Sequence, residues 1–274
     1  MQPISILGDG AADLADRLVD HLHERAEGRV GRVDALAGNE GDDPTDTTAG
    51  GVADTDVRLL DDGTWTATGT GAHLTSLLDR FAPDHEYLIV IGRTRLRVPT
   101  VLVGGDRDPE DVAGTVVATV EAAAAADLDA IVEAVDAAEP WITLEELVER
   151  VKASDEADRS GAIASFTGRV RARDAPDDDR TTHLAFERYE GVAAERMAEI
   201  AAELEARDGV LDVRMHHRTG VIPDGEDIVF VVVLAGHRAE AFRAVEDGID
   251  QLKERVPIFK KETTEREEFW VHDR

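Results

Sequence analysis

Residues 87–91, Tyr-Leu-Ile-Val-Ile, form an uninterrupted apolar run in a chain in which 32% of the residues are charged. A strand that is apolar at every position has both faces buried, which is typical of a parallel sheet covered by helices. Residues 100–103 repeat the pattern. A third short strand, residues 4–7, leads through Gly-Asp-Gly into a helix with an apolar face made by Leu14, Leu18, Val19 and Leu22. These patterns predict an amino-terminal α/β domain with a mostly parallel sheet.

Three further segments complete this first region. Gly38–Asp56 is rich in Gly, Asp and Thr and has no apolar periodicity, which predicts a loop. Val57–Thr68 is predicted as a hairpin. The alanine-rich stretch Asp111–Ala138 predicts a helix that ends before Pro140. We therefore expect one domain at residues 1–138 and a second at residues 139–274.

The second region mixes helices and strands without strict strand–helix–strand repetition, which indicates an α+β fold. Its first predicted helix, Thr143–Lys152, begins with Thr143 and Glu146 at the spacing of a capping box. Its last predicted helix, about His237–Arg255, cannot continue through Pro257. Between them the patterns predict a helix at Val192–Arg207 and strands at Gly161–Arg171, His183–Tyr189, Val210–Arg218 and Asp227–Ala235.

The net charge of −29 excludes several classes of partner. Phosphate contacts need clustered Lys and Arg, so we expect neither nucleic acid nor an anionic membrane as a ligand. The acidic residues are spread along the whole chain. We therefore interpret them as a solvated surface suited to high salt, with an acidic functional surface as the alternative.

The chain has no cysteine, so disulfides, thiolate nucleophiles and Cys-held metals are excluded. It has no run of 18 or more apolar residues, and its first residues lack the basic segment of a signal peptide. We expect a cytoplasmic protein. The adjacent His216 and His217 would point to opposite faces of a strand, so we expect no metal site there.

Lysine is rare in this chain. There are four, of which three lie within nine residues, whereas arginine supplies the remainder of the 30 basic residues. Unlike arginine, lysine can lose its proton and act as base, acid or nucleophile. The cluster of Lys253, Lys260 and Lys261 is therefore a candidate for catalysis, and the alternative is chance clustering at a solvated helix end.

Four short strings follow one another in the second region: Phe166–Arg171, His216–Gly220, Gly236–Phe242 and Leu252–Glu262. Any one string is weak evidence, but their joint order and spacing resemble the MoaE family, the large subunit of molybdopterin synthase. The resemblance covers nearly all of residues 141–274 and includes Trp270-Val271. Phe259 stands where the family usually has a tryptophan.

The resemblance implies an enzyme, a sulfurtransferase. Members of the family convert cyclic pyranopterin monophosphate into the dithiolene molybdopterin. The sulfur arrives as a thiocarboxylate on the carboxy-terminal glycine of a small ubiquitin-like subunit. We therefore expect a MoaD-like partner with a Gly-Gly tail and a homodimer within a heterotetramer. The family needs no metal or other cofactor.

The same resemblance points to Lys253 and Lys260 as the catalytic residues, with Lys253 the first choice. One lysine would bind or protonate the cleaving phosphate ester, and the other would stabilise the acyl intermediate or attack the glycine carbonyl. Because Pro257 interrupts the helix, the two would flank a turn, one on a helix and one on a strand. Substrate contacts are expected from Arg171, His237, Arg238, Phe166, Lys261, Glu262 and Arg274.

The cationic contacts have structural alternatives. Arg171 could hold an oxyanion with both guanidinium nitrogens, or it could form a surface ion pair. His237 and Arg238 stand where a helix begins, and free N–H groups and the helix dipole favour an anion there. A histidine at that position could instead cap the helix or pack in the core. Arg274 aligns with a basic residue that reaches a neighbouring subunit's site in the family.

The remaining contacts are also open. Phe166 and Phe259 could lie near the pterin ring, but aromatic side chains in such strands more often belong to the core. Glu262 could orient a lysine or simply pair with it.

The first 138 residues more faintly resemble the MobB family, P-loop proteins of molybdenum-cofactor biosynthesis. The resemblance rests on the opening strand–helix unit and on the apolar strands near residues 87–103. The phosphate loop is degenerate, because Gly8–Leu14 contains no lysine to reach the β and γ phosphates and places Asp9 and Asp13 where they would repel them. We expect a structural or docking role for this domain.

Functions from different classes stay open. The enzyme is favoured because a decayed site has no reason to retain lysines in a lysine-poor chain. The alternative is a non-catalytic adaptor of molybdenum-cofactor biosynthesis that docks partners through its first domain, and a GTP-binding protein would need the missing phosphate loop. The tail of the ubiquitin-like partner could also become joined to Lys253, Lys260 or Lys261.

Overall fold

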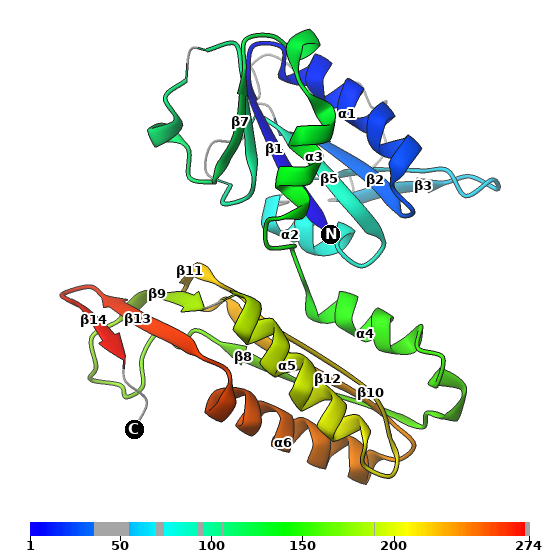
Figure 1. The fold of residues 1–274 in the computed structure, drawn as a ribbon, viewed down its shortest axis with the longest axis vertical. Helices are drawn as coiled ribbons and strands as arrows, with labels where there is room; N and C mark the ends of the chain where they lie inside the picture. The colour runs from blue at the N-terminus through cyan, green and yellow to red at the C-terminus, as the bar shows by residue number, and fades with distance from the viewer. Residues whose placement is uncertain (36–54, 70–73, 93–95, 106, 189, 272–274) are drawn as a thin grey trace. The chain divides into compact units, whose positions relative to one another are not determined.

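The computed structural model describes residues 1–35, 55–69, 74–92, 96–105, 107–188 and 190–271 (Figure 1). The chain divides into two compact units, Met1–Trp141 and Ile142–Arg274, and each has hydrophobic clusters of its own. Among the residues that are described, no helix combines the length and the apolar character that a membrane crossing needs.

The first unit is built on a five-stranded sheet in which every pairing is parallel. β1 (Gln2–Gly8) lies at the centre, between β5 (His85–Ile91) and β6 (Thr100–Val103). β2 (Arg29–Asp34) and β7 (Val116–Val120) form the edges. The expected α/β fold with a parallel sheet is confirmed, and the apolar run at residues 87–91 is buried throughout.

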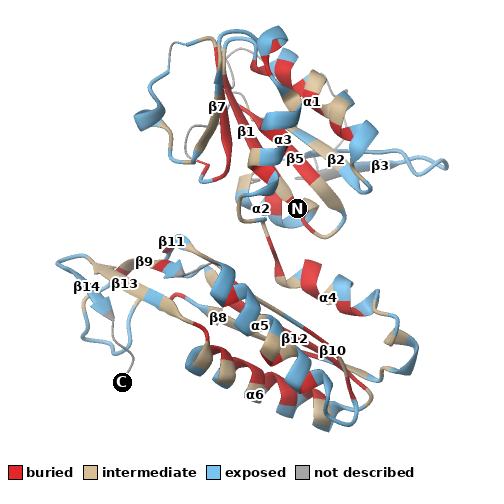
Figure 2. Ribbon diagram, viewed as in Figure 1, coloured by how far each residue is buried: buried red, intermediate tan, exposed pale blue. Residues whose placement is uncertain are grey.

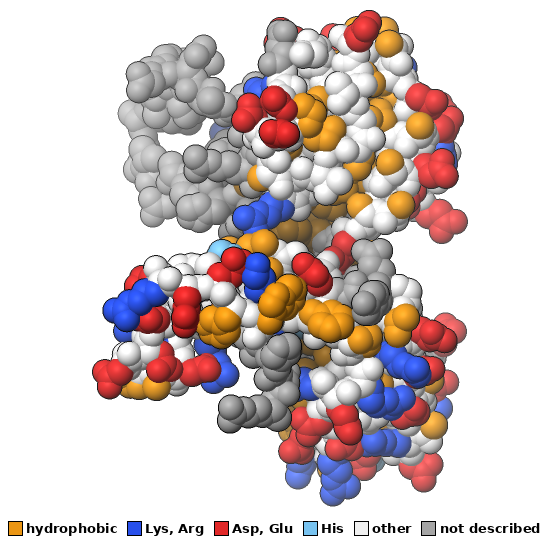
Figure 3. Space-filling model, turned by 60° about the vertical axis from the view of Figure 1, so that its left-hand side comes forward, with side chains coloured by type: hydrophobic (Ala, Val, Ile, Leu, Met, Phe, Trp, Pro, Cys, Tyr) orange, Lys and Arg blue, Asp and Glu red, His pale blue; other side chains and the backbone are white. Residues whose placement is uncertain are grey.

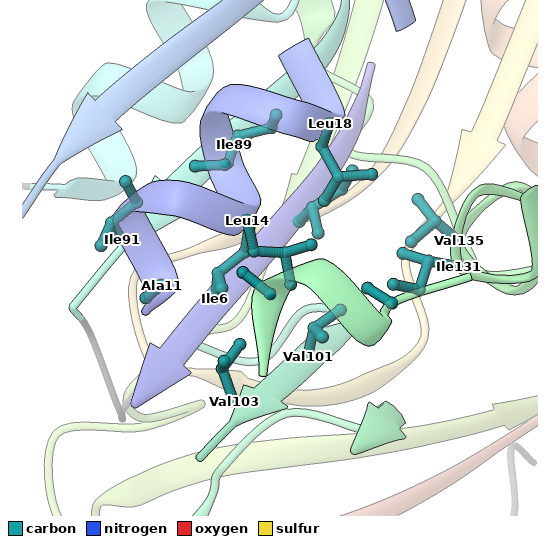
Figure 4. Close-up of a cluster of buried hydrophobic side chains, with 14 of the residues drawn as sticks. Ile6, Ala11, Leu14, Leu18, Ile89, Ile91, Val101, Val103, Ile131 and Val135 are labelled. Atoms are coloured by element: carbon teal, nitrogen blue, oxygen red, sulfur yellow. The ribbon is translucent and has the colours of Figure 1, made fainter. Parts of the chain in front are cut away.

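Helices cover both faces of this sheet, which explains why β5 is apolar at every position. α1 (Ala11–Arg25) and α3 (Leu128–Asp136) pack on one face, where Leu14 and Leu18 of α1 and Ile131 and Val135 of α3 join Ile6, Ile89 and Val101 in one cluster (Figure 4). α2 (Leu74–Phe81) packs on the other face through Leu78, in a cluster with Leu88 and Val90. Alternate residues of β5 therefore enter two different clusters.

The single helix predicted at Asp111–Ala138 is wrong. The segment contains the short 3₁₀ turns η1 (Pro109–Asp111) and η2 (Ala123–Ala125), the strand β7 and the helix α3. Four of the five residues of β7 are β-branched, and β7 extends the sheet by pairing with β6. α3 begins only after Asp127, whose carboxylate accepts a hydrogen bond from the N–H of Ala130 at 3.1 Å.

The predicted hairpin is confirmed as β3 (Thr55–Leu59) paired with β4 (Trp65–Gly69). Gly63 lies in the turn with a φ of +83°. Of the predicted loop Gly38–Asp56, residues 38–54 lie outside the described residues.

The second unit contains an antiparallel sheet of three strands, β10 (Val210–His217), β12 (Asp227–Ala235) and β8 (Ala162–Arg169), with β12 in the middle. α5 (Glu190–Glu205) and α6 (Arg238–Arg255) cover one face. α4 (Leu144–Lys152) covers the other face. A 3.1 Å hydrogen bond from the N–H of Glu146 to the Thr143 hydroxyl caps the start of this helix. The 3₁₀ turn η3 (Ala157–Arg159) leads from α4 toward β8.

The sequence of β12 alternates between these two faces. Val229, Val231 and Val233 enter the cluster beneath α5 and α6, whereas Phe230 and Val232 enter the cluster beneath α4. Figure 2 shows the resulting pattern, with β12 buried and α6 exposed only on its outer side. The predicted α+β class of this region is confirmed.

A second antiparallel sheet follows the order β11 (Gly220–Pro223), β9 (Thr181–Arg188), β13 (Ile258–Thr264) and β14 (Glu268–Val271). Its inner face carries a small buried cluster made by Val170, Leu184, Phe186 and Ile222. The predicted strand Gly161–Arg171 ends earlier than expected, at Arg169, so Arg171 lies beyond it.

Candidate functional site

Lys253 and Lys260 flank the end of α6. Lys253 lies in the last turn of the helix and is exposed. The helix ends at Arg255, Pro257 follows, and Lys260 is the third residue of β13 and partly buried. The predicted arrangement, one lysine on a helix and one on a strand, is present.

The four lysines differ in their ion pairs. Lys152 pairs with Glu149 at 2.7 Å, and Lys261 pairs with Glu268 at 2.6 Å. Lys253 and Lys260 form no ion pair with any carboxylate in the described part of the chain. Although the chain has 59 acidic residues, these two lysines have no carboxylate partner among the described ones, so they are available to bind an external anion.

Neighbouring residues of β13 point to opposite faces of the sheet. Lys260 and Glu262 share the inner face, since they pair with Phe186 and Leu184 of the buried cluster. Lys261 lies on the other face, 5.8 Å from the ring centre of Trp270. The string Lys260-Lys261-Glu262 is therefore divided between two surfaces.

Glu262 pairs with neither lysine of this string. Its carboxylate accepts a hydrogen bond from the buried hydroxyl of Thr181. Lys261 is instead held by Glu268 on the adjacent strand. Glu262 therefore ties β13 to β9, beside the face that carries Lys260.

Arg255 holds the last turn of α6 against α5. Its guanidinium donates to the carboxylate of Glu203 at 2.6 and 2.8 Å, and to the side chain of Gln251 at 2.7 Å. The hydrogen bonds from Arg255 lower the pKa of Glu203 below its usual value. This clamp positions the turn that carries Lys253.

His237 and Arg238 stand at the opposite end of α6. His237 is the N-cap residue, with φ −140° and ψ 159°, and its side chain does not cap the helix. Both side chains are exposed. From Arg238 to Lys253 the helix rises about 22 Å, at 1.5 Å per residue. Within one chain, these two cationic groups are therefore too far apart to contact the same small molecule.

The remaining residues that the sequence singled out are Arg171, Phe166, Phe259 and Arg274. Arg171 is exposed and pairs with Asp174 at 3.1 Å, which matches its alternative as a surface ion pair. Phe166 lies on β8 and packs against the cluster beneath α6, as the core alternative predicts. Phe259 is 47% exposed. Arg274 lies outside the described residues.

The two adjacent histidines enter different environments. His216 stacks near Phe230, with ring centres 6.5 Å apart, on the face covered by α4. His217 is buried and packs edge-to-face against Phe186, with the two ring centres 4.9 Å apart. Sequence patterns did not anticipate the contact with Phe186, because the two residues come from different sheets.

The β1–α1 connection of the first unit is short. Only Asp9 and Gly10 separate Gly8, the last residue of β1, from Ala11, the first residue of α1. Gly8 has a φ of +109°, and a Cβ at this position would lie 1.9 Å from the carbonyl oxygen of Val103. This turn packs against β6, and it is shorter than the loop that wraps a nucleotide phosphate.

Comparison with known proteins gives the following similarities. A family model described as MoaE protein matches residues 137–255. A probable molybdopterin synthase of Haloferax volcanii is 51% identical over 274 residues, which is 100% of both chains. The molybdopterin synthase catalytic subunit of Bacillus subtilis is 36% identical over 132 residues, or 48% of this chain and 80% of that protein. The solved structure of a MobB protein homologue from Bacillus stearothermophilus covers 50% of this chain and 100% of its own, with 19% identity and a TM-score of 0.36.

Proposed function

This chain belongs to the MoaE family of molybdopterin synthase catalytic subunits, and we propose that it transfers sulfur to cyclic pyranopterin monophosphate. The sulfur donor is the carboxy-terminal thiocarboxylate of a small ubiquitin-like subunit, which gives up one sulfur atom and is left as a carboxylate. Two such transfers therefore form the molybdopterin dithiolene. The family relationship supports an enzyme of this pathway, and the residues of the second unit are the basis for the chemistry.

The observation that carries the proposal is the pair Lys253 and Lys260. They are the two lysines without a carboxylate partner among the described residues, and they flank the Pro257 break. Both the phosphate of the substrate and the thiocarboxylate of the donor are anions that need cationic hosts. Lys253 is the principal catalyst and Lys260 the second. One acts on the cleaving phosphate ester and the other on the acyl group of the small subunit.

His237 and Arg238 supply the anion site at the other end of α6. The first-turn N–H groups and the positive end of the helix dipole favour a phosphate or carboxylate there. Because about 22 Å of helix separates them from Lys253, both ends serve one substrate only if a second copy contributes one of them. A homodimer with one small subunit for each chain meets this requirement, and Arg171, Lys261, Glu262, Phe166 and Arg274 would line or border the shared site.

The second candidate function is an adaptor that docks partners of the same pathway. The observation that favours it is the first unit, a separate compact unit whose β1–α1 turn is packed against β6. Nucleotide hydrolysis is not proposed for this unit, because the turn lacks the length and the lysine of a phosphate loop.

The proposal is tested by single-turnover formation of the dithiolene with Lys253→Ala and Lys260→Ala. Lys152→Ala is the matched control, since Lys152 is an exposed lysine in an ion pair on α4. We expect Lys253→Ala to abolish product formation while small-subunit binding stays unchanged, and Lys152→Ala to behave as wild type. Retained turnover in Lys253→Ala would contradict the assignment of the principal residue.

A further inference from the structure

His217 and Phe186 form a buried pair that joins the two sheets of the second unit. His217 is 5% exposed at the end of β10, and Phe186 is 4% exposed in β9. Their ring centres lie 4.9 Å apart and their planes meet at 72°, the edge-to-face geometry that aromatic rings prefer. His217 Nδ1 lies 2.7 Å from the carbonyl oxygen of Arg218, which can only accept a hydrogen bond. The bond fixes the orientation of the imidazole ring.

Phe186 lies directly opposite Lys260 in the pairing of β9 with β13. Residues that pair in this way project to the same face, with their Cβ atoms about 5 Å apart. On the other side of Phe186, the paired residue of β11 is Gly220, which contributes no side chain. The ring of Phe186 therefore has His217 as an aromatic neighbour and Lys260 as its cross-strand neighbour.

The side chain of Lys260 needs a packing contact to fix its orientation, because no ion pair among the described residues does so. It is partly buried, and it forms no ion pair with a carboxylate of the described residues. Lys261 offers the contrast, since Glu268 and Trp270 both hold its ammonium group. The aliphatic stem of a lysine packs readily on an apolar surface while its amine reaches outward. The strand pairing makes the ring of Phe186 the apolar surface at the position next to Lys260.

We infer that His217 is a positioning residue for Lys260, acting through the ring of Phe186. The inference rests on the proposed function, because it gives Lys260 its role in sulfur transfer. It also explains the role of two residues in the string His216–Gly220, one of the four on which the family resemblance rests. His217 fixes Phe186, and Gly220 leaves the β11 side of that ring without a competing side chain.

The test compares His217→Asn with His216→Asn. Asparagine retains an N–H donor for the carbonyl of Arg218 but removes the ring that meets Phe186. His216 is a matched control, since it is the adjacent histidine and faces Phe230 on the opposite side of β10. We expect His217→Asn to slow single-turnover sulfur transfer by about 10-fold or more, as misplaced catalytic groups do, with small-subunit affinity unchanged. His216→Asn should keep the wild-type rate.

A second readout does not depend on sulfur transfer. The rate at which an N-hydroxysuccinimide ester acylates each lysine is measured by peptide mass spectrometry, on full-length folded protein. His217→Asn and Phe186→Leu should change the rate at Lys260 by about threefold or more relative to Lys152, and His216→Asn should not. An unchanged rate at Lys260 in both variants would overturn the inference.

The outcomes separate this inference from the proposed function. Full turnover in Lys260→Ala would remove Lys260 from the reaction, while the acylation rates would still test its positioning. Loss of turnover in Lys260→Ala with normal turnover in His217→Asn would overturn the inference alone. In a double-mutant cycle with Lys260→Arg, His217→Asn should cost less than it does in the wild type. Fully additive effects would instead indicate a general structural role and would overturn the inference.

Discussion

Replacing Leu252 by alanine tests whether the second unit alone supports turnover. Leu252 is 2% exposed, lies on the buried side of α6 and directly precedes Lys253. Leu22 is the matched control, since it is 0% exposed in the core of the first unit. Each substitution removes three carbons from a packed core. At about 0.8 kcal/mol per carbon, plus the cost of the cavity, each should lower the free energy of unfolding of its own unit by about 3 kcal/mol.

For a unit of this size, about 3 kcal/mol corresponds to a fall of about 10 °C in its melting temperature. Scanning calorimetry measures the two melting transitions, and single-turnover assays across the same temperatures measure sulfur transfer. We expect turnover to fall with the melting transition of the second unit in Leu252→Ala. In Leu22→Ala, turnover should persist after the first unit has melted. Equal loss of turnover in both variants at matched stability would refute the reasoning that the second unit works alone.

Three further predictions concern stability. Thr143→Ala should cost the second unit about 1 kcal/mol, because the N–H of Glu146 loses its hydroxyl acceptor at the start of α4; denaturant unfolding measures this, and an equal loss in Thr143→Ser would contradict it. The pKa of Glu203 is lowered in the folded chain by hydrogen bonds from Arg255, so their stabilisation is present above the usual carboxyl pKa of 4.5 and is lost as the pH falls through the lower folded value. The difference in melting temperature between wild type and Glu203→Gln should therefore shrink below about pH 4.5, and a constant difference would argue against this linkage. Raising NaCl from about 0.1 M to about 1 M should raise the melting temperature, because it shortens the screening length from about 10 to about 3 Å and weakens the self-repulsion of a chain with net charge −29; a flat or falling profile would speak against it.

The balance of charges is visible on the surface of the chain. In Figure 3, acidic and basic side chains are interspersed over the second unit. Many arginines of this unit are already paired with acids, as Arg207 is with Asp247 and Arg196 with Glu199. Exposed pairs of this kind contribute little and are screened by salt, so we expect repulsion among the remaining acids to dominate the salt response.

Strands that are buried on both faces could be predicted from the sequence. β6 and β12 have the predicted bounds, and β5 differs by two residues at its start. An apolar residue at every position is a local signal, because it states directly that neither face meets water. The end of α6 was equally predictable, since Pro257 forbids a longer helix.

Elements whose identity depends on distant pairing were missed. β7 lies in an alanine-rich stretch and becomes a strand by pairing with β6. β11 has only four residues and is defined by its pairing with β9. Propensity is a weak guide where tertiary pairing decides the outcome.

In the candidate site, too, local features could be predicted from the sequence and contacts between distant residues could not. The positions of Lys253 on a helix and Lys260 on a strand followed from the local pattern. The hydrogen bond from Thr181 to Glu262 joins residues 81 positions apart, and the contact of His217 with Phe186 joins two sheets. Such contacts depend on the register between strands, which no local pattern contains.

Conversion of cyclic pyranopterin monophosphate by the wild-type chain tests the central claim most directly. The measurement is a single turnover at high salt with the small subunit supplied either as its thiocarboxylate or as its ordinary carboxylate. The account predicts dithiolene product with the thiocarboxylate form and none with the carboxylate form. Absence of product from folded protein with the thiocarboxylated partner bound would contradict it and would favour the adaptor.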